Sequence, residues 1–108
     1  MLSFEKRANY RKAVEAVGYY RMEMEGYKTE REMFVADISL SGIGFKPFDS
    51  RRFKLGHRLR LRFVLTYKKT VPIQCDAIVM RIIDGFIGAQ FIGMEENTKK
   101  EIGFYLLP

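Results

Sequence analysis

Asp37, Ser39 and Gly42, near the middle of the chain, have the types and spacing of a small polar binding edge. They end an apolar run, and side chains at positions i and i+2 of an extended chain point to the same face. The sequence therefore predicts a carboxylate and a hydroxyl side by side at a strand end. Gly42 offers either a positive φ or room for close approach to the backbone. The alternative is a purely structural Asx or serine turn with a glycine bend.

A basic cluster occupies the first twelve residues. Arg7 and Arg11 lie four positions apart, with Lys6 just before them and Asn9 between them. The planar arginine fork binds phosphate oxygens in pairs and stacks on flat rings. We expect this arm to fold over the Asp37 edge and to hold an anionic ligand there. A solvated basic tail is the alternative.

Length and composition narrow the class of protein. A chain of 108 residues is one domain, and its formal charge of +6 favours anionic partners such as nucleotides, nucleic acid or a membrane surface. The single cysteine, Cys75, excludes a disulfide within the chain and fits a reducing compartment. No signal-peptide pattern is present, and no apolar stretch approaches the ~18 residues that cross a bilayer. We expect a cytoplasmic protein or module with no membrane span.

Alternating apolar and polar residues predict six β-strands. The clearest signal is at residues 58–65, where apolar residues alternate with Arg58, Arg60 and Arg62. Asp84-Gly85 is a strong two-residue hairpin signal, and Glu25-Gly26 is a turn signal. We expect the strands over residues 14–25, 27–38, 42–48, 58–65, 71–83 and 87–91.

Near the end of the chain, the spacing of apolar residues changes from a strand pattern to a helical one. Thr98 followed by Glu101 is a capping-box pattern, and Ile102, Tyr105 and Leu106 then form one apolar helical face. The expected fold class is all-β: a six-stranded antiparallel β-barrel with a short C-terminal α-helix on its mouth. We expect residues 1–108 to form a single domain, with a flexible basic arm at 1–12, the barrel at 13–93 and the helix at 95–107.

The chain resembles the PilZ domain family in the order of its motifs. An Arg-x-x-x-Arg motif (Arg7, Arg11) is followed by a predicted strand pair and then by an Asp-x-Ser-x-x-Gly motif (Asp37, Ser39, Gly42). The resemblance covers nearly the whole chain. It implies a six-stranded barrel that binds the bacterial second messenger cyclic di-GMP, with no cofactor and no metal. It also implies a protein partner or fused effector domain that responds when the arm becomes ordered. The output, whether motility, exopolysaccharide synthesis or virulence, is not specified by these residues.

The resemblance also gives each residue a role. Arg7 and Arg11 would contact guanine and phosphate, and Asp37 would accept hydrogen bonds from guanine. Ser39 would donate to a phosphate or a base edge, Gly42 would let the ligand lie against the backbone, and Asn9 would add a polar contact. Lys6 stands where an extra arginine accompanies binding of a stacked pair of ligands, so one or two ligands per domain stays open.

Two other classes of function remain open. The Arg58, Arg60 and Arg62 face is either solvated, a contact surface for an acidic partner, or the binding face of an RNA- or DNA-binding barrel. A PilZ-like protein-interaction module that does not bind the nucleotide is the other alternative. An enzyme is not expected, because His57 and Cys75 belong to no catalytic or zinc-binding motif.

Overall fold

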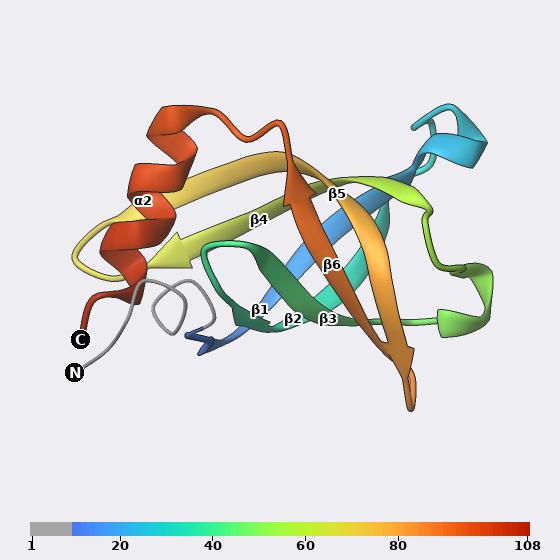
Figure 1. Ribbon diagram of the computed structural model, residues 1–108, viewed down its shortest axis with the longest axis horizontal. Helices are drawn as coiled ribbons and strands as arrows, with labels where there is room; N and C mark the ends of the chain where they lie inside the picture. Colours follow the sequence, from blue (N-terminus) through green and yellow to red (C-terminus); the bar gives the residue numbers. More distant parts are fainter. Residues whose placement is uncertain (1–9) are drawn as a thin grey trace.

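Six antiparallel strands close into a barrel in the computed structural model of the protein, which describes residues 10–108 (Figure 1). The order around the barrel is β1-β2-β3-β6-β5-β4. Closure pairs β1 with β4 and so leaves no free sheet edge. The strands are β1 (Lys12–Met22), β2 (Arg31–Ile38), β3 (Gly42–Pro47), β4 (Arg58–Thr66), β5 (Thr70–Ile83) and β6 (Phe86–Ile92).

The predicted all-β class and six strands are confirmed, but the first turn is longer than the sequence indicated. A 3-10 helix, η1 (Glu23–Glu25), follows β1. Gly26 and Tyr27 then both take the left-handed conformation, with φ of 64° and 57°. The chain therefore re-enters the barrel only at Arg31. A second 3-10 helix, η2 (Ser50–Arg52), lies between β3 and β4.

The core follows from strand alternation. On β4 the side chains that point inward are at most 2% exposed, and they are Leu59, Leu61, Phe63 and Leu65. The three arginines and Val64 point outward. Three aromatic rings pack against one another inside the barrel, with centroids 5.0–6.1 Å apart. They belong to Tyr20, Phe45 and Phe53. The β5–β6 hairpin turns at Asp84-Gly85 as predicted, because both residues take a positive φ, 50° and 84°.

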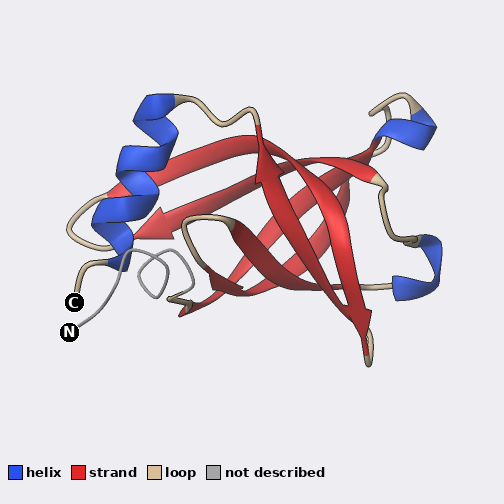
Figure 2. Ribbon diagram, viewed as in Figure 1, coloured by secondary structure: helices blue, strands red, loops and turns tan. Residues whose placement is uncertain are grey.

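The helix α2 (Glu96–Leu106) lies across one end of the barrel, where Figure 2 shows it beside the β4–β5 loop. Ile102, Tyr105 and Leu106 are buried, as the sequence predicted. The predicted capping box is wrong: the helix begins at Glu96, with no side-chain cap. The Glu101 carboxylate instead accepts a hydrogen bond of 2.6 Å from the Tyr67 hydroxyl, so a tertiary contact has replaced the local one.

Candidate functional site

Arg11 and Asp37 form an accessible ion pair at the start of β1 and the end of β2. Arg11 Nε donates to Asp37 Oδ1 over 2.8 Å, and a second guanidinium nitrogen lies 2.8 Å from the same oxygen. The strand register causes this meeting, because Ala13 of β1 lies opposite Asp37. The two side chains are 46% and 37% exposed. Since an exposed ion pair contributes about 1 kcal/mol or less, an incoming ligand can replace it.

The pair stands at one side of an open groove of about 710 Å³. The floor of the groove runs along β3 and β6, and β5 forms the far wall. Its lining includes Gly42, Gly44, Arg81, Phe86 and Gly88. A groove of this size is within the range of small-molecule sites.

Ser39 does not line the groove, contrary to the expectation that its hydroxyl faces the same side as Asp37. The side chain is 0% exposed. Its Oγ accepts hydrogen bonds from the backbone N–H groups of Gly42, at 3.1 Å, and Ser41, at 3.3 Å. The i, i+2 rule fails here because β2 ends at Ile38, so Ser39 already belongs to the turn. In this structure Ser39 shapes the turn and does not face a ligand.

Gly42 is required by the neighbouring strand. Its φ is not positive, and a Cβ at this position would lie 2.4 Å from the carbonyl oxygen of Ala89 on β6. Of the two predicted reasons for glycine, close approach to the backbone is the correct one. However, the group that approaches is the β6 backbone and not a ligand.

Gly44 is a groove-lining residue next to Asp37 that the sequence analysis missed. A Cβ there would lie 2.8 Å from Asp37 Oδ1, so the missing side chain makes room for the carboxylate. The signal that could have found it is the Gly42-x-Gly44 spacing, which puts two glycines on one face of a strand.

The remaining predicted site residues, Lys6, Arg7 and Asn9, lie outside the described residues. The structure therefore brings together Arg11 and Asp37 of the predicted set and places Gly42 beside them. Ser39 is buried in the turn between β2 and β3.

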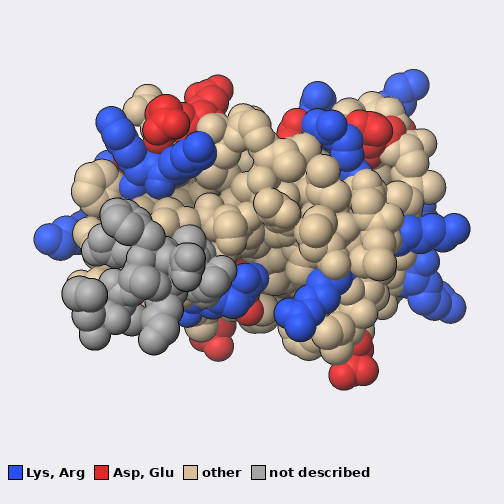
Figure 3. Space-filling model, in the orientation of Figure 1, with Lys and Arg blue, Asp and Glu red and all other residues tan. Residues whose placement is uncertain are grey.

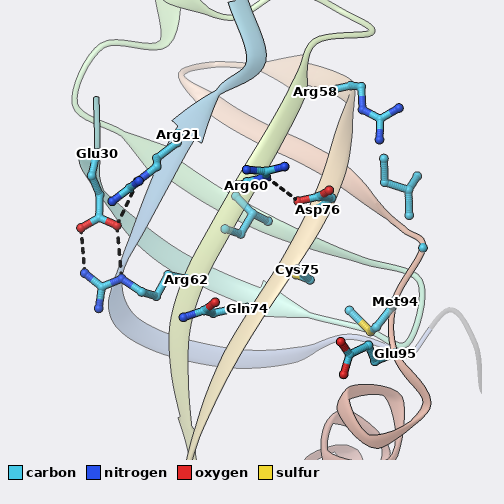
Figure 4. Close-up of a pocket in the computed structure, with 13 residues that line it drawn as sticks. Arg21, Glu30, Arg58, Arg60, Arg62, Gln74, Cys75, Asp76, Met94 and Glu95 are labelled. Atoms are coloured by element: carbon cyan, nitrogen blue, oxygen red, sulfur yellow. Dashed lines mark hydrogen bonds and ion pairs between the residues drawn. The ribbon is translucent and has the colours of Figure 1, made fainter. Parts of the chain in front are cut away.

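The arginine face of β4 borders a second groove, of about 670 Å³ (Figure 4). Each guanidinium on this face lies near a carboxylate: Arg62 is 2.8 Å from Glu30 and Arg60 is 3.5 Å from Asp76. Arg58 lies 3.4 Å from Glu23. The cationic charge is thus largely balanced by local acids.

Two of the β4 arginines form cation–π contacts with tyrosine rings. The Arg60 guanidinium lies 3.9 Å from the centroid of the Tyr27 ring, and that of Arg62 lies 4.3 Å from the Tyr19 ring. On the face that Figure 3 shows, cationic and anionic side chains are interspersed around the edge, and uncharged side chains fill the centre.

Three further features concern the single cysteine, possible metal ligands and membrane-spanning helices. Burial raises the pKa of the Cys75 thiol to about 12, so the group stays protonated and unreactive. Residues 10–108 contain no cluster of three or more potential metal ligands of the His, Cys, Asp or Glu type. Over the same residues, no helix has the length and apolar character needed to cross a membrane.

The closed barrel and the helix across its end define a six-stranded antiparallel β-barrel domain, with an open groove beside Arg11 and Asp37. The chain belongs to the PilZ domain family, whose model, described as PilZ domain, matches residues 5–107. The predicted resemblance is therefore confirmed. No curated protein matches the chain in sequence.

Solved structures with this fold include two PilZ domains and an inhibitor of motility. The PilZ domain of CeSA from a cellulose-synthesizing bacterium is 10% identical, with a TM-score of 0.63 and 90% of each chain covered. The PilZ domain of YcgR from Escherichia coli, solved with c-di-GMP, is 12% identical with a TM-score of 0.65; the match covers 86% of this chain and 82% of that one. The inhibitor of motility MotI/DgrA from Bacillus subtilis is 22% identical with a TM-score of 0.69, over 89% of this chain and 46% of that one.

Proposed function

We propose that this domain binds cyclic di-GMP in the groove beside Arg11 and Asp37, with the basic arm closing over it. The observation that carries the proposal is the accessible Arg11–Asp37 pair at the groove mouth of a PilZ domain. An acid in a site for a dianion needs a chemical reason. Guanine supplies one, because its N1–H and amino group donate to a carboxylate.

The ion pair can exchange partners without leaving either charge unpaired. When guanine donates to Asp37, Arg11 is released to the phosphate or to guanine O6 and N7, both of which arginine binds with two hydrogen bonds. Arg7, Lys6 and Asn9 would add contacts from the arm. In this proposal Gly42 and Ser39 act through the turn: Gly42 lets β3 approach β6, and Ser39 holds the turn that carries it.

Ordering of the arm would be transmitted to the C-terminal helix. Lys12 follows Arg11 directly, and its ammonium group donates to the Tyr105 carbonyl over 2.8 Å and lies 4.4 Å from the Tyr105 ring centroid. The Tyr105 hydroxyl in turn donates to the Ala13 carbonyl over 3.2 Å. The helix therefore holds the first residues of β1, and a partner protein or fused effector domain that contacts α2 would sense the ligand. A second messenger acts inside the cell, so the proposal places the domain in the cytoplasm as a receptor and not as an enzyme.

Calorimetric titration with cyclic di-GMP tests the proposal. We expect micromolar or tighter binding that is lost in Arg11→Ala and Asp37→Ala. Arg51→Ala is the matched control, because this arginine is 90% exposed and does not line the groove. The same titration gives the stoichiometry, and Lys6→Arg tests whether a second ligand is recruited. Heats no larger than dilution would reject nucleotide binding and favour a PilZ-fold module that binds only protein.

Nucleic-acid binding is the weaker alternative, because the β4 arginines are already paired with acids. A gel-shift series at increasing salt separates it from the proposal. Strong, salt-sensitive binding of oligonucleotides that survives Asp37→Ala would favour a nucleic-acid-binding barrel.

A further inference from the structure

One row of residues crosses four strands of the barrel at the floor of the groove. Asp37 on β2 lies opposite Gly44 on β3, and Gly44 lies opposite Gly88 on β6. Gly88 lies opposite Arg81 on β5. The row thus reads acid, glycine, glycine, arginine. Three strand spacings separate its ends, about 14 Å between backbones.

Both charged side chains lean inward over the glycines. A Cβ on Gly44 would lie 2.8 Å from the Asp37 carboxylate, and a Cβ on Gly88 would lie 3.2 Å from the Cβ and 3.7 Å from the Cδ of Arg81. Each glycine therefore accommodates the side chain of the next strand outward. Because neither glycine has a side chain of its own, only the side chains of Asp37 and Arg81 rise above this part of the floor.

Arg81 differs from the other arginines of residues 10–108. The other eight each lie within 4.0 Å of a carboxylate oxygen. Within the same residues Arg81 forms no ion pair, although it is exposed and lines the groove. Asp37 and Asp84 also line the groove, but neither pairs with Arg81, so this cation is available to an anion.

Exposed apolar side chains flank this end of the groove. Met80, Ile83 and Phe86 are 57%, 51% and 45% exposed, and all three line it. An aromatic ring and aliphatic groups next to a cation form a surface on which a purine base can stack. The far wall therefore offers both a charge for a phosphate and an apolar face for a base.

We propose that Arg81 is a second anion-binding arginine of the site and that the Gly44–Gly88 floor seats a flat base between it and Asp37. The inference rests on the proposed function and extends it. Asp37 and Arg11 take one end of the ligand and Arg81 takes the other, so the site spans a molecule with phosphate groups and bases at both ends.

Calorimetry with cyclic di-GMP on the full chain tests the assignment. A two-bond arginine contact is worth enough that Arg81→Ala should weaken the affinity about tenfold to a hundredfold. Arg81→Lys keeps the charge without the fork and should lie between wild type and Arg81→Ala. Gly88→Ala, which pushes against the Arg81 side chain and raises the floor, should also weaken binding. Arg51→Ala controls for loss of one positive charge, and circular dichroism verifies that each variant is folded.

The outcomes separate this inference from the proposed function. If Asp37→Ala abolishes binding while Arg81→Ala binds as Arg51→Ala does, the role of Arg81 is overturned and the receptor proposal stands. If the unmodified protein gives no heat above dilution, both are overturned. A loss in Arg81→Ala well beyond that in Arg51→Ala, with the fold intact, supports the assignment.

Discussion

Replacing Ser39 by alanine should lower the stability of the fold, and should affect ligand affinity only through that loss. The change removes one oxygen from a side chain that is 0% exposed. That oxygen accepts hydrogen bonds from the backbone N–H groups of Gly42 and Ser41. The backbone bond from Ser39 N to the Gly42 carbonyl, at 2.8 Å, remains in the variant.

The size of the stability loss depends on which backbone groups lose a hydrogen-bond partner. Gly42 is buried, so its N–H would be left without an acceptor, whereas Ser41 is exposed and water can replace its bond. One buried, unsatisfied N–H costs about 1–3 kcal/mol. In a domain of this size that lowers the melting temperature by about 5–15 °C.

Equilibrium unfolding in urea, followed by far-ultraviolet circular dichroism, measures the effect; the chain has no tryptophan to serve as a fluorescent probe. Ser41→Ala is the matched control, because within residues 10–108 the Ser41 hydroxyl forms a hydrogen bond only with Ser39 Oγ, over 3.3 Å. It should stay within about 0.5 kcal/mol of the wild type. A Ser39→Ala variant as stable as the control but unable to bind cyclic di-GMP would refute this reasoning and return Ser39 to direct ligand contact.

Three further predictions concern stability. Gly42→Ala should destabilise by about 2 kcal/mol or more, because its Cβ would meet the Ala89 carbonyl oxygen at 2.4 Å; urea unfolding at wild-type stability would contradict this. Gly103→Ala should instead stabilise by about 0.5–1 kcal/mol in the same assay, because the helix has room for the methyl group, whose nearest neighbour is 3.9 Å away, and alanine is the better helix former; a loss would contradict it. Hydrogen bonding to Arg31 lowers the pKa of Glu25 from its ordinary 4.5, so this carboxylate stabilises the fold above that pH and stops doing so as the pH falls through the lowered pKa; acid titration of Glu25→Gln should show a smaller loss of stability than the wild type over this range.

Local patterns were sufficient to predict most of the fold. The alternation at residues 58–65 identifies β4, because burial on one face of a strand imposes a period of two on the sequence. The Asp84-Gly85 turn is similarly local, since its two φ values depend on those two residues alone. The capping box failed for the opposite reason: Glu101 hydrogen-bonds to Tyr67, which lies far from it in sequence.

The geometry of the site was harder to predict from the sequence than the fold, because it depends on strand register. The sequence predicts Asp37 at a strand end, but one residue decides whether Ser39 continues the strand or begins the turn. The glycine floor requires Gly44 and Gly88, on strands far apart in sequence, to be direct partners. No local sequence pattern predicts that pairing. Arg81 can be recognised as a groove residue only when β5 is known to pair with β6.

The motif Asp-x-Ser-x-x-Gly thus combines two physical tasks. Asp37 is exposed enough to meet a ligand, and its ion pair with Arg11 holds the site in a form that a ligand can open. Ser39 and Gly42 are buried, and they fix the turn and the β3–β6 contact on which the position of the groove depends. A barrel that kept Ser39 and Gly42 but lost Asp37 would therefore keep its fold and its groove while losing its acceptor for guanine. Under the proposed function, such a change would remove nucleotide binding without any rearrangement of the fold.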